Sequence, residues 1–189
     1  LTSCCICVCV WLENSPPSFA TNFLNTYAKI LINYGSFSEA ISLMEKAIKL
    51  DSNSMRSYAA LGHSYRGLGK LKEALLAWAH QHDSYGNHDL AYIYRNSDFN
   101  TAMQAWIKKA ATPDAPIYSG DFTVAVIFAY LKDKENTFKH LEQAYLTHDR
   151  IEEMKNWVIF DFLRDEPRYK ELYRKLNFDA YDEYRKTLK

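Results

Sequence analysis

The chain has 189 residues, of which 23 are basic and 23 acidic, so its formal net charge is zero. A neutral chain has neither the basic excess typical of nucleic-acid-binding proteins nor an acidic tail, so we expect no contact with nucleic acid. Hydrophobic residues make up 48% and charged residues 24%, which is ordinary for a globular chain with one core or a short stack of repeats.

Residues 1–20 stand apart from the rest of the chain. They contain every cysteine, namely Cys4, Cys5, Cys7 and Cys9. Three interpretations stay open: a zinc site, a lipidated or membrane-proximal segment, and an unstructured end or remnant of an upstream segment. The apolar run from Cys4 to Leu12 is shorter than the roughly 20 residues that span a bilayer, and no basic start of a signal peptide precedes it. We therefore expect no membrane span and a cytoplasmic protein. The opening Leu1 suggests a fragment or a processed product.

Residues 21–84 contain one pattern written twice with a period of 34 residues. The equivalent pairs are Ala28 and Gly62, Leu31 and Tyr65, Gly35 and Gly69, Phe37 and Leu71, Ala40 and Ala74, and Met44 and Trp78. The small residues of each copy lie 12 positions apart, which predicts two helices, A and B, that cross closely. The glycine between them suits a left-handed helix end. This period and spacing resemble the tetratricopeptide repeat, whose hairpins bury their apolar faces only by stacking.

Two further copies follow. The third copy keeps the spacing of helix B in Asp98, Phe99, Ala102 and Trp106, but it is six residues shorter than the 34-residue period. We therefore predict a clipped helix over about 88–94 and a second helix over about 98–111. In the fourth copy the spacing returns in Ala125, Phe128, Thr137, Leu141 and Ala144.

Residues 148–178 change character and predict a cap. A dense apolar stretch, 157–163, precedes Asp165, which we expect to cap a helix with Pro167 in its first turn. That helix carries an apolar stripe, Tyr169, Leu172, Tyr173 and Leu176. Stacked repeats need such a lid at their open end. Phe178, Tyr181, Tyr184 and Leu188 predict a last helix along the same surface.

The string FDFLRDEPRYKELYRKLNF, residues 160–178, resembles the ending of many bacterial tetratricopeptide regions. The matching residues are Asp161, Leu163, Arg164, Pro167 and Arg168, whereas Phe162, Glu166 and Tyr169 replace the usual proline, aspartate and phenylalanine. Residues 124–145 are similar to the penultimate hairpin of such regions. These regions occur at the C-terminal ends of winged-helix regulators, nucleotide cyclases and protein kinases, so the resemblance covers the fold better than the function.

We therefore predict an all-α fold, a right-handed superhelical solenoid of tetratricopeptide helix-turn-helix hairpins with a C-terminal capping helix. The predicted division is a non-repeat stub and linker over 1–20, about four hairpins over 21–147, and capping helices over 148–189.

No cluster of residues predicts catalysis, a metal site or a cofactor. The densest group of potential ligands is His80, His82, Asp83, His88 and Asp89, but residues two apart on a helix point to different sides. Gly67 to Lys70 lacks the longer glycine spacing and the following Ser or Thr of a phosphate loop. We therefore predict a non-catalytic scaffold that binds a protein or peptide partner; the alternative is a C-terminal regulatory fragment of a larger bacterial signalling enzyme or transcription regulator.

The resemblance implies that helix A of each hairpin lines a concave groove. The candidate groove residues are Asn22, Asn25, Lys29, Ile32, Asn33, Arg56, Ala59, His63 and Arg66. Three full positive charges and a histidine on one surface of a neutral chain favour an acidic partner segment. We expect Ile32 and Ala59 to leave room for an apolar anchor of that partner.

Overall fold

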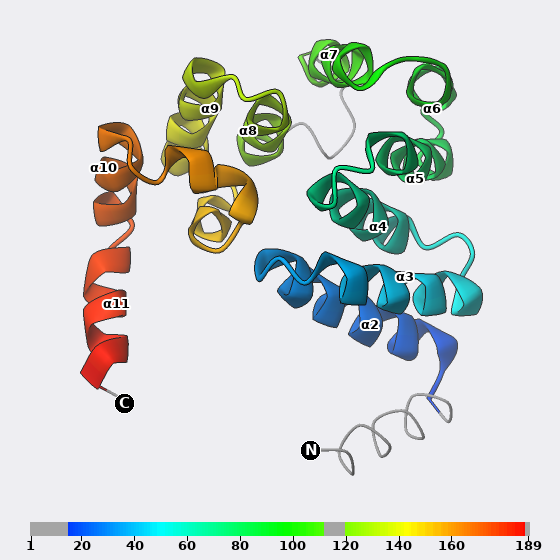
Figure 1. Ribbon diagram of the computed structural model, residues 1–189, viewed down its shortest axis with the longest axis horizontal. Helices are drawn as coiled ribbons and strands as arrows, with labels where there is room; N and C mark the ends of the chain where they lie inside the picture. The colour runs from blue at the N-terminus through cyan, green and yellow to red at the C-terminus, as the bar shows by residue number, and fades with distance from the viewer. Residues whose placement is uncertain (1–14, 112–119, 188–189) are drawn as a thin grey trace. The chain divides into compact units, whose positions relative to one another are not determined.

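The computed structural model describes residues 15–111 and 120–187, and every regular element in these ranges is a helix (Figure 1). No helix in the described ranges is long and apolar enough to cross a membrane. The cysteines and Leu188 lie outside these ranges, so the predictions made for them stay predictions. Contacts divide the chain into two compact units, Leu1–Ala102 and Met103–Lys189, each with its own packing.

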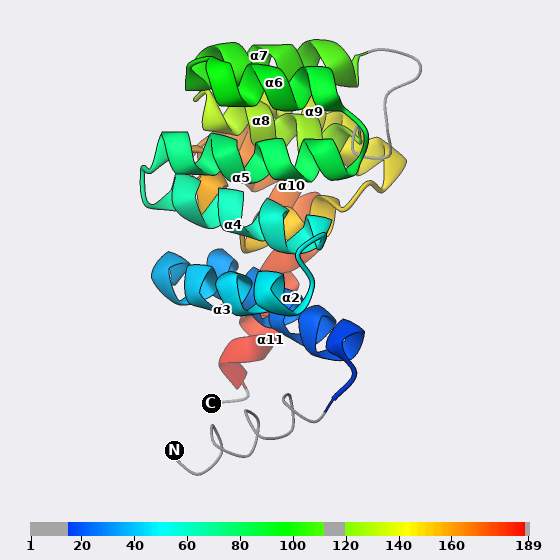
Figure 2. The ribbon, with the colours of Figure 1, turned by 90° about the vertical axis from the view of Figure 1, so that its right-hand side faces the viewer.

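The first unit is built from helix hairpins that pack on one another. Its helices are α2 (Pro17–Asn33), α3 (Phe37–Leu50), α4 (Met55–Gly67), α5 (Leu71–Ser84), α6 (His88–Asn96) and the start of α7 (Phe99–Ala110). Helix α2 packs on α3, α3 on α4, α4 on α5 and α5 on α6. Figures 1 and 2 both show α4 and α5 running alongside one another. The order of helices confirms the all-α hairpin solenoid, including the clipped helix of the third copy.

The small residues of the repeat lie where the helices cross. Ala28, Ala40 and Ala74 have no exposed surface. Gly62 is also buried, and a Cβ atom built there would lie 2.3 Å from Nε1 of Trp78. Helices α4 and α5 can therefore approach this closely only because position 62 has no side chain.

The larger repeat residues behave less uniformly. Met44 is fully buried in a core that continues through Leu24, Ala47 and Leu61. Phe37 packs against that core and reaches the space left by the missing side chain of Gly67. Leu71, at the same register as Phe37, is instead 39% exposed, so this position does not contribute equally to the two hairpins.

The turns inside the hairpins share one backbone geometry. Gly35 and Gly69 have φ angles of 76° and 75°, as expected for the left-handed end of helix A. In each turn the amide of the next residue donates a hydrogen bond back into the helix, for example Ser36 N to Leu31 O at 2.9 Å. At the corresponding turn of the fourth copy the residue is Lys132, with φ 60°. Because a side chain disfavours this conformation, Lys132 introduces strain that the glycines avoid.

The second unit contains the fourth hairpin and the cap. Its elements are the end of α7, α8 (Asp121–Tyr130), α9 (Lys134–Thr147), the 3-10 helices η1 (Ile151–Lys155) and η2 (Val158–Leu163), α10 (Pro167–Lys175) and α11 (Phe178–Thr187). Helix α8 is buried on nearly every side and packs on α9 and η2. Phe160 and Leu163 of η2 are fully buried, and Phe160 contacts Phe122 with ring centroids 5.8 Å apart. The apolar stretch predicted as a lid therefore covers α8.

Helix α10 begins differently from the prediction. Its N-cap residue is Glu166 rather than Asp165, and no side chain there accepts a capping hydrogen bond. Pro167 occupies the first turn as predicted, and its fixed φ suits that position. The carboxylate of Glu166 pairs with Lys134 of α9 instead, so this residue joins two helices.

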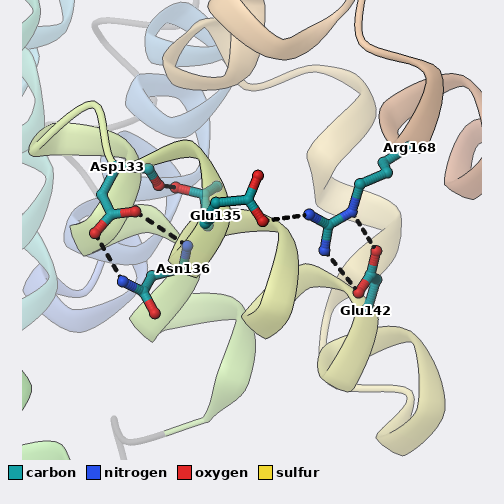
Figure 3. Close-up of polar contacts among 6 residues, drawn as sticks. Asp133, Glu135, Asn136, Glu142 and Arg168 are labelled. Atoms are coloured by element: carbon teal, nitrogen blue, oxygen red, sulfur yellow. Dashed lines mark hydrogen bonds and ion pairs between the residues drawn. The ribbon is translucent and has the colours of Figure 1, made fainter.

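Arg168 attaches the cap to the fourth hairpin (Figure 3). Its Nε and Nη2 donate to the two carboxylate oxygens of Glu142 at 2.9 and 3.0 Å, and its Nη1 donates to Glu135 at 2.9 Å. The guanidinium also lies 4.6 Å from the ring centroid of Phe138. Both carboxylates are on α9, whose first turn is fixed by the Asp133 side chain accepting from Asn136 N. Arg168, a residue of the terminal motif, thus acts as a bidentate link between α10 and α9.

Candidate protein-binding surface

The nine candidate groove residues lie on α2 and α4 and differ in how accessible they are. Asn22, Lys29 and Arg56 are exposed, and Asn25, Asn33, Ala59, His63 and Arg66 are half-buried. Ile32 is buried, with 9% of its surface accessible, and belongs to the core of the first unit. A partner could reach Ile32 only if the core opened, so Ile32 is not included in the binding surface that we propose below.

Asn25 links the two hairpins. Its Oδ1 accepts a hydrogen bond from Ser57 Oγ at 2.9 Å, and its Nδ2 lies 3.5 Å from Ser54 Oγ. Ser57 Oγ is also 2.8 Å from Ser54 Oγ, and Ser57 is fully buried. Asn25 therefore positions α4 against α2. This role comes from residues about 30 positions apart, so the repeat pattern alone could not indicate it.

His63 and Arg66 lie against aromatic rings. The His63 ring meets Trp78 edge-on with centroids 5.5 Å apart, and the Arg66 guanidinium lies 5.4 Å from the centroid of Phe99. Trp78 donates from Nε1 to the Ala59 carbonyl at 3.3 Å, which holds its indole against α4. These contacts restrict the two side chains to few rotamers, which lowers the entropy cost when they bind a ligand.

Arg56 is the most available cation of the set. It is exposed and forms no ion pair with any residue that the structure describes. Asn33 contributes a different feature, because its Oδ1 is buried and accepts no hydrogen bond within the described ranges. The surface thus combines the guanidinium of Arg56, an exposed lysine, and an arginine and a histidine that lie against aromatic rings.

A second accessible surface on α2 is apolar, and our sequence analysis missed it. The side chains Phe19, Phe23, Tyr27, Ile30 and Tyr34 recur every three or four residues and are 37–83% exposed. One repeat later, Tyr27 and Ile30 correspond to Leu61 and Ser64, which are buried. The 3.6-residue spacing of large apolar residues was the available signal. Exposed apolar patches of this kind are typical of protein–protein contact regions.

The histidine cluster does not form a ligand set. His80 stacks on Tyr58 at 4.9 Å, and His82 is buried edge-on against Tyr94 at 4.7 Å. Burial lowers the pKa of His82 to about 4, so its ring is neutral at pH 7. The described part of the chain contains no group of three or more His, Cys, Asp or Glu side chains placed to hold a metal ion.

The model of one protein family, described as tetratricopeptide repeat, matches residues 21–54, which comprise α3, most of α2 and the turn that follows. The match and the stacked helix hairpins together support a tetratricopeptide-type protein. No curated protein and no solved structure matches the chain. Tetratricopeptide repeats expose extended surfaces for other proteins, which suggests a protein–protein interaction module. The resemblance to bacterial regulators stays a prediction.

Proposed function

We propose that this chain is a non-catalytic scaffold that binds an acidic, partly apolar peptide or helix on the exposed faces of α2 and α4. The observation that carries the proposal is the set of accessible basic side chains Lys29, Arg56, His63 and Arg66, of which His63 and Arg66 lie against aromatic rings. Arg56 and Arg66 can each bind a carboxylate through two N–H donors. Ala59 and the ring of Phe99 offer apolar surface beside them.

Electrostatics favour an acidic partner over a neutral one. A local positive surface on a chain with zero net charge accelerates the encounter with an acidic segment more than it raises the final affinity. Exposed charges are screened over about 8–10 Å at physiological ionic strength. Binding should therefore weaken as salt is added, mainly through slower association.

The experiment begins with peptides selected from a random library on the intact chain and then labelled for fluorescence anisotropy. We expect the selected peptides to be acidic with one or two apolar residues, and to bind about tenfold more weakly or worse to an Arg56→Glu, Arg66→Glu double variant. A Lys46→Glu, Lys72→Glu double variant is the matched control, since it makes the same charge change at exposed positions on the B helices α3 and α5.

Circular dichroism of each variant must match the wild type before affinities are compared. Because Arg66 lies on Phe99, an Arg56→Glu single variant provides a second measurement that leaves this ring contact intact. Equal affinity for wild type and the α4 variants, or an equal loss in the Lys46, Lys72 control, would remove the α2 and α4 surface from the proposal.

A further inference from the structure

The second unit contains a cleft that the proposed peptide surface does not use. Its volume is about 390 Å³, and it lies between the end of η2, the outer side of α10 and the start of α11. The lining residues are Arg164, Tyr169, Lys170, Tyr173, Arg174 and Asp179. Three lining side chains are cationic and one is acidic, so the lining carries a net charge of about +2 at neutral pH.

Arg164 is held rigidly at the edge of this cleft. Its Nε donates to Asp161 Oδ1 at 2.6 Å, and its Nη1 lies 3.1 Å from the Lys155 carbonyl and 3.3 Å from Tyr169 Oη. Its Nη2 forms no hydrogen bond with any described residue. The guanidinium is thus oriented through two nitrogens while the third is left to bind a ligand, and such preorganisation reduces the cost of binding.

The other two lining cations, Lys170 and Arg174, are not fixed in the way that Arg164 is. Lys170 and Arg174 are exposed on α10, and neither side chain makes a hydrogen bond or ion pair within the described ranges. They differ in this from Lys175 on the same helix, which pairs with Glu171 at 2.8 Å. The cleft therefore offers N–H donors from three separate side chains.

Apart from the carboxylate of Asp179, the lining offers few hydrogen-bond acceptors. The Tyr169 hydroxyl donates to the Met154 carbonyl at 3.0 Å, and the Tyr173 hydroxyl donates to Asp182 at 2.5 Å, so both phenols are already engaged. Their rings stack with centroids 6.2 Å apart, and the half-buried ring of Tyr173 is the accessible one, because Tyr169 is only 2% exposed. A ligand that fits must accept hydrogen bonds and carry negative charge.

We propose that this cleft binds a phosphate monoester. A phosphate monoester has a charge of about −1.5 to −2 and three acceptor oxygens, which match a lining of +2 with three cationic donors, whereas a carboxylate offers one charge and two oxygens. A cleft of about 390 Å³ also has room for the organic group that carries the phosphate, lying against the Tyr173 ring. The carrier is either a phosphorylated side chain of a protein or a small phosphorylated molecule.

The test is an NMR titration of the backbone amides of α10 in the intact chain. The probes are inorganic phosphate, a blocked phosphoserine tripeptide, and the same tripeptide with glutamate in place of phosphoserine. We expect saturable shifts with both phosphate probes and at least tenfold weaker binding of the glutamate peptide. A phosphopeptide that binds tighter than inorganic phosphate indicates a protein source, and equal binding indicates a small-molecule source.

Variants decide whether the cleft is the site. Arg174→Gln and Lys170→Gln should each weaken phosphate binding roughly tenfold, as expected for losing a charge-assisted hydrogen bond. Both positions are exposed, so the fold should tolerate them. Arg185→Gln, an exposed arginine on α11 outside the lining, is the control and should leave binding unchanged. No shift up to about 10 mM phosphate, glutamate binding equal to phosphoserine, or an equal loss in Arg185→Gln would each overturn the proposal.

Discussion

Replacing Gly62 tests the close crossing of α4 and α5 directly. An alanine Cβ would lie 2.3–2.6 Å from three atoms of the Trp78 indole. Trp78 cannot move aside easily, because it is 5% exposed and its ring contacts His63, Tyr94 and Phe99. Moving it would also lose the hydrogen bond from Nε1 to the Ala59 carbonyl.

The effects of a Gly62→Ala change on the free energy of unfolding oppose one another, and each can be estimated. Glycine to alanine inside a helix normally stabilises by about 0.5–1 kcal/mol. Overpacking costs roughly 1–3 kcal/mol, and the hydrogen bond contributes about 1 kcal/mol. We therefore expect Gly62→Ala to lower the free energy of unfolding by about 1–3 kcal/mol, and the larger side chain of Gly62→Leu to lower it by more than Gly62→Ala does.

Urea denaturation of four proteins provides the assay: wild type, Gly62→Ala, Trp78→Leu and the double variant. The smaller side chain at position 78 should relieve the clash, so the two changes should cost less together than the sum of the single costs, by about 1 kcal/mol. A Gly62→Ala protein as stable as wild type or more stable, together with additive effects in the cycle, would show that these helices do not meet at Gly62.

Three further predictions concern other parts of the fold. In thermal denaturation, the Lys132→Gly variant should be about 1 kcal/mol more stable than the Lys132→Ala variant. Both variants lose the contact with Phe162, but only glycine relieves the strain of the left-handed backbone at this position. Equal stability of the two variants would exclude such strain. Arg168→Gln should cost about 1 kcal/mol and more than Lys175→Gln, whose ion pair lies within one exposed helix; equal costs would argue against a special role for the Arg168 link. Burial lowers the pKa of His82 to about 4 in the folded state, whereas an exposed histidine has a pKa of about 6.5. The unfolded chain therefore takes up this proton first, so the stability from the neutral ring is complete above about pH 6.5 and is lost as pH falls to about 4. His82→Gln should flatten that part of the pH–stability curve, and an unchanged slope would contradict the assignment.

The sequence by itself determined the elements and their repeat. The 34-residue period located the first two hairpins, the left-handed glycines Gly35 and Gly69, and the small residues at the crossings. These features follow from local periodicity and backbone preference, which are readable without knowing any distant contact. The shortened third copy could be predicted for the same reason. Its helix B residues keep their spacing, so the six missing residues must shorten the helix before them.

Only the tertiary structure decided which side chains are available and what they contact. Asn25 and Ile32 occupy groove positions in the pattern, yet one is bonded to Ser57 and the other is buried. The cleft around Arg164 depends on hydrogen bonds from Arg164 to residues of η1, η2 and α10. The helical period determines only the side of the helix on which a residue lies. Burial and hydrogen bonding depend on neighbours that are distant in the sequence. Residues at equivalent positions of two repeats can therefore differ in exposure.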